Sequence, residues 1–302
     1  MNEKKSILRF GYIFLRFGNS DVFSNAELCP IILNKEKMKT IFITGASTGL
    51  GKAAALLFQN KGWRVIATMR NPETATELLA LENVSVLPLD VTNPEQIQTA
   101  VEKSLELGEI DVVFNNAGYG LLGPLEALTD EQIVRQINTN LLGVIRVTQA
   151  FIPYFREKGA GTFISTTSIG GLITFPLNSI YHATKWALEG WSESMAFELK
   201  PFGIDIKTVS PGGIKTDFVS RSLDSATSSA YEKMTDSLFS AMEGMMEAAS
   251  APEQIAEVVY EAATDGKNKL RYVAGEDAKA LYAQRLELGD EAFREQLGKQ
   301  FI

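Results

Sequence analysis

The chain has 302 residues, of which 45% are hydrophobic and 22% are charged. This composition fits a soluble globular protein that buries a large core, and the length suits one large α/β domain or two small ones. The formal net charge is −8 and no segment is strongly basic, which argues against a nucleic-acid-binding protein because phosphate backbones attract basic surfaces.

Cysteine and histidine each occur once, as Cys29 and His182. A single cysteine cannot form an internal disulfide, which fits a reducing compartment. One cysteine and one histidine also cannot supply the usual zinc ligands, and no calcium-loop spacing is present. We therefore expect a cytoplasmic protein without a metal site.

The first 37 residues differ from the rest of the chain. The segment KKSILRFGYIFLRFG (residues 4–18) begins with basic residues, but Arg9 and Arg16 interrupt its apolar run. It is a poor secretory signal and too short to span a bilayer. Residues 1–37 are a flexible tail, a short amphipathic surface element, or sequence upstream of a true start at Met38. We favour the tail or the later start, because the pattern of an ordered domain begins abruptly at Met38.

From Met38 onward, short runs rich in β-branched and aromatic residues alternate with helical patterns. The helical stretches include residues 50–62 and residues 93–108, where Asn93 is the expected N-cap. No linker rich in proline or serine divides residues 38–285, so we expect one domain over 38–302. The pattern predicts a doubly wound α/β fold of the Rossmann type, in which about seven parallel strands carry helices on both faces. The predicted strands are residues 39–44, 63–68, 84–89, 110–114, 161–166, 203–210 and 270–274.

A glycine-rich turn, TGASTGLG (residues 44–51), follows the first predicted strand and opens the first predicted helix. Glycines permit positive φ in a tight turn and let the backbone approach a pyrophosphate, which then lies at the positive end of the helix. Such turns also occur for purely steric reasons, but the strand before this one and the helix after it favour a dinucleotide site. The residues expected at the phosphates are Gly45, Ser47, Thr48, Gly49, Leu50 and Gly51.

Further motifs follow in a fixed order after this TGxxxGxG turn. They are NNAG (115–118), TTS (166–168), the YxxxK pair Tyr181 and Lys185, and PGGIKT (211–216). Over residues 38–275 this set resembles the short-chain dehydrogenase/reductase family, in its compact single-domain branch. The segments ATMRNPE (67–73) and NKLRYVAGEDA (268–278) resemble the subgroup of steroid- and retinol-type dehydrogenases. The resemblance implies an oxidoreductase that moves a hydride between a nicotinamide and a carbonyl compound or secondary alcohol.

Three proton-carrying side chains stand together in IYHATKWAL (residues 180–188). Positions i and i+4 share a helix face, so Tyr181 and Lys185 point the same way, while His182 points about 100° away. We therefore expect His182 to be a packed or surface residue. Tyrosine ordinarily has a pKa of about 10, and a neighbouring ammonium together with an oxidised nicotinamide would lower it. Tyr181 is thus the expected general acid and base, and the resemblance implies that Lys185 also binds the nicotinamide ribose.

Two more residues complete the catalytic set that the resemblance implies. Ser168, 13 residues before Tyr181, follows a predicted strand and can donate a hydrogen bond to the substrate oxygen. Its neighbours Ser165, Thr166 and Thr167 are expected to be ordinary polar residues at a strand end. Asn140, in NTNLLG (138–143), matches the asparagine that orders a water near the lysine in the family. Asn138 is the alternative, and the choice between the two rests on the resemblance alone. The expected tetrad is Asn140, Ser168, Tyr181 and Lys185.

Cofactor choice should depend on the residues after the second predicted strand. An NAD enzyme usually places an acidic residue there, but Met69 stands in this place, 24 residues after Gly45, and Arg70 follows it. A guanidinium suits a 2′-phosphate, which favours NADP, with NAD as the alternative. One departure is Thr48, where many NADP-preferring relatives carry a second basic residue. Arg70 can also be an ordinary solvated cation near a helix start.

The resemblance implies further cofactor contacts. Asp90 should meet the adenine, although it can equally cap the segment that follows it, and Asn115 should brace the sheet. PGGIKT should hold the carboxamide end. Beyond those already named, the expected cofactor residues are Asp90, Val91, Asn116, Ala117, Gly118, Pro211, Gly212, Ile214 and Thr216.

Residues 217–250 are the expected substrate lid. Their apolar side chains favour a fairly hydrophobic alcohol or ketone, or they simply pack the lid onto the core. These side chains are Phe218, Met234, Phe239, Met242, Met245 and Met246. The family resemblance also implies a homodimer or homotetramer formed through residues 131–155 and 179–200. Trp186 and Trp191 are anchors of that interface or core residues.

Two other classes of protein share parts of this pattern. A non-catalytic dinucleotide sensor typically loses the tyrosine or the lysine, whereas this chain keeps both. A nucleotide-sugar epimerase or dehydratase usually has the turn TGxxGxxG and a larger C-terminal domain. Both patterns therefore differ from this chain, and we expect an enzyme whose substrate is a small-molecule alcohol or ketone. From the charge and the hydropathy described above, we expect no nucleic-acid partner and no membrane-spanning segment.

Overall fold

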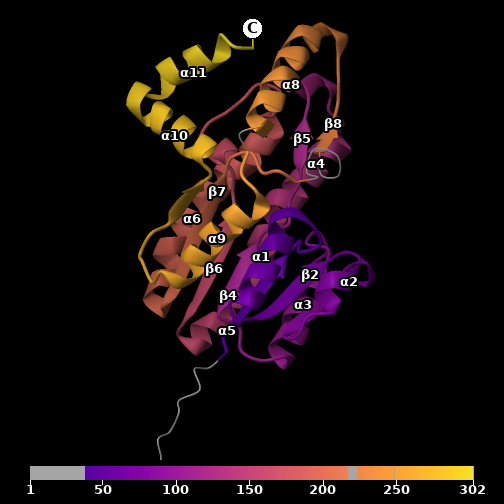
Figure 1. Cartoon of the computed structure of the whole chain (residues 1–302), viewed down its shortest axis with the longest axis vertical. Coiled ribbons are helices and arrows are strands. Elements are labelled where there is room, and N and C mark those ends of the chain that lie inside the picture. Colours follow the sequence, from indigo (N-terminus) through magenta and orange to yellow (C-terminus); the bar gives the residue numbers. More distant parts are fainter. Residues whose placement is uncertain (1–37, 217–222, 248, 302) are drawn as a thin grey trace, which may run out of the picture. The chain divides into compact units, whose positions relative to one another are not determined.

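The computed structural model describes residues 38–216, 223–247 and 249–301, and within them seven parallel strands form one sheet (Figure 1). The strand order is β3-β2-β1-β4-β6-β7-β9. Each strand coincides within one or two residues with a predicted run, so the predicted doubly wound sheet is confirmed. The strands are β1 (Thr40–Thr44), β2 (Arg64–Met69), β3 (Val84–Pro88), β4 (Val112–Asn115), β6 (Gly161–Thr166), β7 (Ile204–Pro211) and β9 (Arg271–Ala274).

Helices cover both faces of this sheet, and the strand sequences show why. Along β1, Ile41 and Ile43 join the core cluster on one face, whereas Phe42 between them joins the cluster on the other. Neighbouring side chains in a strand point to opposite faces, so a strand covered on both sides needs apolar residues on both, as Ile41, Phe42 and Ile43 provide between Thr40 and Thr44. The first face is covered by α1 (Gly49–Asn60) and α9 (Pro252–Thr264). The second is covered by α3 (Pro94–Glu106), α5 (Gly143–Lys158) and the end of α6 (Ser179–Leu199).

The strand order places the functional loops. From β1 the chain builds the sheet in one direction through β2 and β3, and then returns to the other side of β1 with β4. The crevice beyond the carboxyl ends of strands at such a reversal is where open α/β sheets bind ligands. The glycine-rich turn follows β1 and NNAG follows β4, so both motifs lie at this crevice.

Local capping fixes where the helices begin. The Asn93 side chain accepts the Gln96 N–H at 2.9 Å, which confirms the predicted cap of α3. A capping box between Thr129 and Gln132 opens α4 (Asp130–Ile137), which is followed by a π-helical turn, Asn138–Leu142, and then by α5. The remaining helices are α2 (Thr76–Leu79), α8 (Glu232–Glu247), α10 (Glu276–Leu288) and α11 (Asp290–Gly298). Short 3-10 turns span Pro72–Thr74, Leu125–Ala127, Ile169–Gly171, Lys200–Phe202 and Ser229–Tyr231.

A second, two-stranded parallel sheet was not predicted. It pairs β5 (Gly120–Leu122), just after NNAG, with β8 (Leu223–Ser225) in the expected lid. The segment from β8 into α8 thus packs against the main domain next to the NNAG loop. The residues from Met38 onward group as one compact unit.

Some predictions fall on residues outside the described ones. These are the predictions for residues 1–37 and for residues 217–222, which include Phe218, and 248 of the expected lid. Among the described helices, none combines the length and the apolar character that a bilayer crossing requires.

Candidate active site

The glycine-rich turn between β1 and α1 has no room for side chains at two positions. Gly45 has φ of +68° and a Cβ there would lie 2.8 Å from the Cα of Ala117. Gly49 has φ of +55°, while a Cβ on Gly51 would clash with the carbonyl oxygen of Gly45. Gly45 and Gly49 therefore supply the left-handed backbone, and Gly51 allows the helix to pack on its own turn. The side chain of Thr48 does not cap α1, which leaves the positive helix end open to an anion.

Residues after β4 brace this turn from behind. The Asn116 Nδ2 donates to the carbonyl oxygens of Thr44 at 3.2 Å and Gly45 at 3.0 Å. The Thr44 Oγ1 in turn accepts the backbone N–H groups of Asn116 and Ala117, each at 3.0 Å. Asn115 Nδ2 donates to Thr148 Oγ1 on α5 at 3.0 Å, as expected of a residue that braces the sheet. The turn and the NNAG loop thus form one rigid unit.

Tyr181 and Lys185 lie on the same face of α6, one turn apart. The Lys185 Nζ is 5.7 Å from the centre of the Tyr181 ring and donates to the Thr166 carbonyl oxygen at 2.9 Å. Lys185 is 6% exposed, and Tyr181 keeps part of its surface open to the cavity beside it. The spacing that predicted a shared helix face is confirmed.

Burial dominates the electrostatics of this pair. It raises the pKa of Tyr181 above 10.0, which a hydrogen bond from the Ser168 side chain partly offsets. It also lowers the pKa of Lys185 from 10.5 to about 8, against the opposing effect of the nearby Glu189 carboxylate. In the protein alone, therefore, the pKa of Tyr181 lies above its ordinary value. The expected lowering of this pKa depends on Lys185 together with an oxidised nicotinamide, and it stays a prediction.

Ser168 and Asn140 reach the site in different ways. Ser168 follows β6, is 9% exposed and lies in the cavity wall. Asn140, in the π-helical turn, is 1% exposed and does not line the cavity. Its Oδ1 accepts the Tyr119 N–H at 3.0 Å and its Nδ2 donates to the Tyr119 carbonyl at 2.8 Å. Its side chain thus holds the segment after NNAG in place, and its expected link to Lys185 through water stays a prediction.

One cavity of about 780 Å³ brings the other predicted residues together at the carboxyl ends of the strands. Of the predicted cofactor residues, Gly51 alone is absent from its wall, since it lies behind Gly45. The predicted residues in the wall, together with Ser168, are Gly45, Ser47, Thr48, Gly49, Leu50, Arg70, Asp90, Val91, Asn116, Ala117, Gly118, Tyr181, Lys185, Pro211, Gly212, Ile214 and Thr216.

The residues expected to select the cofactor also line this cavity. Met69 is buried at the end of β2, and Arg70 next to it is exposed. The Asp90 Oδ1 accepts from the Thr92 N–H at 2.9 Å and the Thr92 Oγ1 at 2.7 Å. The capping role expected as an alternative for Asp90 is therefore present, while the residue still faces the cavity.

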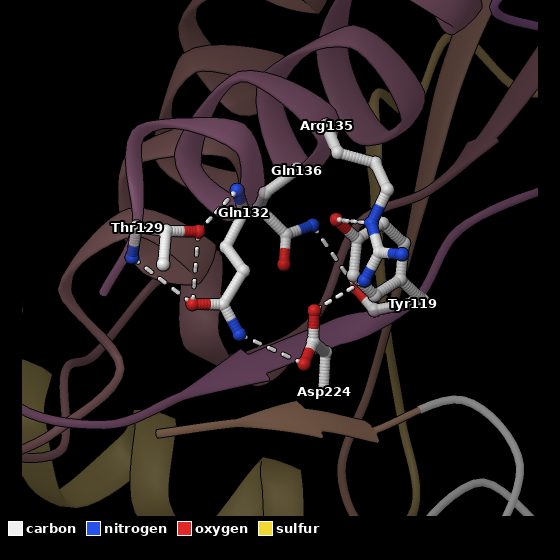
Figure 2. A network of polar contacts seen from close by, with 6 residues as sticks. All are labelled: Tyr119, Thr129, Gln132, Arg135, Gln136 and Asp224. Carbon is white, nitrogen blue, oxygen red and sulfur yellow. Dashed lines mark hydrogen bonds and ion pairs between the residues drawn. The ribbon is translucent and has the colours of Figure 1, made fainter. Parts of the chain in front are cut away.

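A polar network that the sequence did not predict forms the wall between α4 and β8 (Figure 2). Asp224 on β8 forms an ion pair with Arg135 and accepts from the Gln132 Nε2 at 2.9 Å, and both partners lie on α4. The Arg135 Nε donates to the Tyr119 hydroxyl at 3.1 Å, and the Gln136 Nε2 donates to the Tyr119 carbonyl at 3.1 Å. Figure 2 shows these side chains converging on Tyr119 and Asp224. The network fastens β8 to α4 beside the NNAG loop.

Tyr119, Arg135 and Asp224 are cavity residues that sequence reasoning missed. For Tyr119 a signal existed, because it directly follows Gly118 of NNAG. Arg135 and Asp224 are 89 residues apart in the chain, and their pairing depends on the two-stranded sheet, which no local pattern indicated.

An acidic residue near the C-terminus contacts the turn after β7. Gly213 donates its N–H to the Asp277 Oδ2 at 2.7 Å, and Gly212 donates to the Ala274 carbonyl at 3.0 Å. A Cβ on Gly212 would clash with the Asp277 carboxylate. The other carboxylate oxygen of Asp277 is buried and has no hydrogen-bond partner among the described residues. Gly212 was predicted from the sequence to contact the cofactor. The structure gives a second reason for a glycine here, because a side chain would collide with the Asp277 carboxylate.

Comparison with known proteins decides the family. A family model described as short chain dehydrogenase matches residues 39–226, which hold the glycine-rich turn, the four residues of the expected tetrad and PGGIKT. The chain belongs to the short-chain dehydrogenase family. Enzymes of this family are oxidoreductases that act on CH–OH or C=O groups, and so does this one. Helices α8 to α11, and with them Asp277, lie beyond the matched residues.

Relatives of this short-chain dehydrogenase include an uncharacterized oxidoreductase of Schizosaccharomyces pombe, 39% identical over 235 residues, which cover 76% of this chain and 100% of the relative. The human protein 17-beta-hydroxysteroid dehydrogenase type 1 is 34% identical over 265 residues, or 82% of this chain and 80% of the relative. Among solved structures, ElxO with NADP bound superposes with a TM-score of 0.68 at 27% identity, over 81% of this chain and 100% of ElxO. The expected kinship with steroid-type dehydrogenases agrees with the human relative.

Proposed function

We propose that this short-chain dehydrogenase uses NADP(H) to reduce a carbonyl compound or oxidise a secondary alcohol, with Tyr181 as general acid and base. One observation carries the proposal. A single cavity runs from the glycine-rich turn at β1 to Ser168, Tyr181 and Lys185, so that a dinucleotide held at one end would reach the proton-carrying groups at the other.

The residues of the turn fit a dinucleotide. Side chains are excluded at Gly45 and Gly51, and the uncapped α1 N-terminus suits a pyrophosphate. Met69 stands in the cavity wall where an NAD enzyme would carry an acid, and the guanidinium of Arg70 beside it favours the 2′-phosphate of NADP. The NADP bound to ElxO supports the same choice. A preference for NAD is the alternative.

The nicotinamide nucleotide would donate or accept the hydride, and a side chain of the protein would donate or accept the proton. Because burial raises the pKa of Tyr181, its phenol is protonated at neutral pH and ready to donate to a carbonyl oxygen during reduction. In the opposite direction the phenolate accepts the alcohol proton. Ser168 donates a hydrogen bond to the same oxygen and stabilises the charge that develops there.

Lys185 has two tasks in this proposal. Its pKa of about 8 leaves the amine mostly protonated at pH 7, so it stabilises the phenolate form of Tyr181 when that form appears. Its hydrogen bond to Thr166 fixes the amine against the end of β6, next to the strand end that carries Ser168. The family resemblance adds a contact to the nicotinamide ribose.

The substrate side of the cavity favours an apolar ketone or alcohol. Leu223, Met242 and Met246 line it from β8 and α8, and flexible methionines adapt to apolar ligands. The steroid named for the human relative is a molecule of this kind. The Arg135–Asp224 ion pair lines the same cavity, so one part of its wall is polar.

The test is to follow NADPH absorbance with the full-length protein over a panel that contains a 17-keto steroid, a long-chain 3-ketone and 4-nitrobenzaldehyde. The proposal predicts turnover with at least one member and a higher kcat/KM for NADPH than for NADH. The reverse preference would establish the NAD alternative. NADPH binding without turnover on any member would instead support a non-catalytic sensor.

Two further expectations belong to this proposal. A homodimer or homotetramer would form through residues 131–155 and 179–200. In the second segment Trp186 is 41% exposed and lies under the Arg285 guanidinium. Sedimentation at micromolar concentration tests this, and a monomer would contradict it. A cytoplasmic location stays a prediction, which fractionation of the source cells would test.

A further inference from the structure

The only histidine of the chain is buried next to Tyr181, with 5% of its surface exposed. Its Nδ1 lies 2.7 Å from the Gly170 carbonyl oxygen, and its Nε2 accepts the Phe175 N–H at 2.9 Å. A nitrogen that accepts carries no proton, so the ring is neutral with its hydrogen on Nδ1, which donates to Gly170. Both ring nitrogens are therefore used to hold one loop, residues 169–175.

Gly170 connects this histidine to the reacting groups. Its carbonyl accepts from His182, while its N–H donates to the Ser168 Oγ at 3.0 Å. A Cβ on Gly170 would lie 2.7 Å from the His182 Nδ1 and 3.2 Å from the Tyr181 Cε1. Any side chain at this position would push the ring or Tyr181 away, so a glycine at 170 and a histidine at 182 form a matched pair.

The hydrogen bond from the Gly170 N–H to the Ser168 Oγ decides whether the serine hydroxyl can act as a donor. Because its oxygen accepts from Gly170, its own O–H is free to donate, and a hydrogen bond between Ser168 and Tyr181 contributes to the pKa of Tyr181. If the Gly170 peptide rotated, the hydroxyl would lose the acceptor bond that orients it. The orientation of the Ser168 hydroxyl thus depends on the imidazole through one glycine.

The other end of the loop is held as firmly. The Phe175 bond closes the loop onto α6, and Ile169, Leu172 and Ile173 pack against Ala278 of α10 and Phe293 of α11. Tyr181 is the titratable side chain in ring contact with His182, at 5.8 Å between ring centres. Among charged side chains, Glu189 faces the loop near Gly171, and Arg285 lies over the ring of Trp186, which lines a shallow pocket together with His182.

We propose that His182 is a positioning residue for Ser168: it holds the Gly170 peptide so that the serine hydroxyl points at Tyr181 and the substrate oxygen. The proposal rests on the proposed function, since the serine matters only if the chain reduces a carbonyl. It gives the histidine a part in the site that the spacing of the YxxxK pair does not reveal.

Two substitutions separate positioning from packing. His182→Phe keeps an aromatic ring but removes both hydrogen bonds, whereas His182→Asn keeps an N–H donor near the position of Nδ1. In the reduction of 4-nitrobenzaldehyde by NADPH, His182→Phe should lower kcat roughly 10- to 100-fold and leave the NADPH dissociation constant unchanged. This loss is smaller than the about 10²- to 10³-fold cost of removing a transition-state hydrogen-bond donor outright, because the serine itself remains. His182→Asn should restore a large part of kcat. Tyr260→Phe, on α9 and outside the cavity wall, is the control and should keep normal kcat.

A double-mutant cycle then shows whether His182 acts through Ser168. On a Ser168→Ala background, His182→Phe should cause no further loss of kcat, because there is no hydroxyl left to orient. Losses that multiply would overturn the proposal and indicate a purely structural histidine. If Ser168→Ala alone leaves kcat unchanged, the serine has no catalytic role. That result would contradict the proposed function itself, whereas losses that multiply contradict only the positioning role of His182.

A spectroscopic readout tests the geometry without any substrate. Because the chain has one histidine, the ring nitrogens of the 15N-histidine-labelled full-length protein give the signals of His182 alone. At pH 7 the proposal predicts a protonated Nδ1 and an unprotonated, hydrogen-bonded Nε2. A proton on Nε2, or a charged ring at that pH, would overturn it whatever the activity.

Discussion

The Lys185 ammonium lies 5.7 Å from the centre of the Tyr181 ring while its hydrogen bond goes to the carbonyl of Thr166. Lys185 is buried and Tyr181 is half-buried at the cavity, and burial shifts the pKa of each in the direction that favours its neutral form. The site therefore holds a cation at a cost in folding stability, which a protein keeps only where the charge has a task.

Replacing this lysine should stabilise the fold and abolish activity. Folding lowers the pKa of Lys185 from 10.5 to about 8, so its burial penalty is full below pH 8 and disappears as pH rises toward 10.5. Lys185→Met should therefore raise the free energy of unfolding at pH 7 by up to about 3 kcal/mol. Urea unfolding at pH 7 and at pH 10 measures the gain, which should shrink at the higher pH.

The matched control for this experiment is Lys103→Met, an exposed lysine on α3. It should change stability by less than about 0.5 kcal/mol at either pH. A lower free energy of unfolding for Lys185→Met at pH 7 would show that the Lys185 amine stabilises the fold, and would contradict the predicted cost of burying it.

Arg70 should decide between the two nicotinamide cofactors. Arg70→Ala removes the guanidinium from the cavity wall, and we expect about tenfold weaker NADPH binding, equal to about 1.4 kcal/mol, with NADH binding unchanged. Titration of protein fluorescence with each nucleotide measures both constants. Arg156→Ala, an exposed arginine at the end of α5, is the control. Equal weakening for both nucleotides would remove Arg70 from cofactor selection.

Asp277 should support the cofactor from outside the cavity. Asp277→Ala leaves the Gly213 N–H without its acceptor, and the turn that lines the cavity should loosen. We expect the NADPH dissociation constant to rise about threefold to tenfold. Asp277→Asn, which keeps an acceptor oxygen, should bind almost normally, and so should Glu276→Ala at the neighbouring exposed position. Unchanged binding in Asp277→Ala would confine this residue to local structure.

Much of the fold and of the site could be predicted because local patterns encode it. The central residues of β1, Ile41–Ile43, are apolar on both faces because helices cover both sides of the sheet, and the cap at Asn93 is a short-range contact. The i, i+4 spacing was sufficient to place Tyr181 and Lys185 on one face of α6.

What escaped prediction depends on contacts between distant segments. Asp277 meets Gly213 across 64 residues, and Asp224 meets Arg135 across 89. The pairing of β5 with β8 involves three residues on each side, too few for a strand pattern to stand out. The pKa of Tyr181 was also beyond the sequence, since it depends on how tightly other elements enclose the ring.

The central claim is that Tyr181 moves the proton. The most direct test compares Tyr181→Phe with the unmodified protein in NADPH-dependent reduction of the best ketone or aldehyde of the panel, with NADPH affinity measured on the same samples. Loss of the phenol should lower kcat about 10²- to 10⁴-fold, the usual share of a general acid, and leave NADPH affinity within about twofold. Tyr260→Phe, on α9 and outside the cavity wall, should behave normally. A Tyr181→Phe enzyme that keeps near-normal kcat would contradict the account.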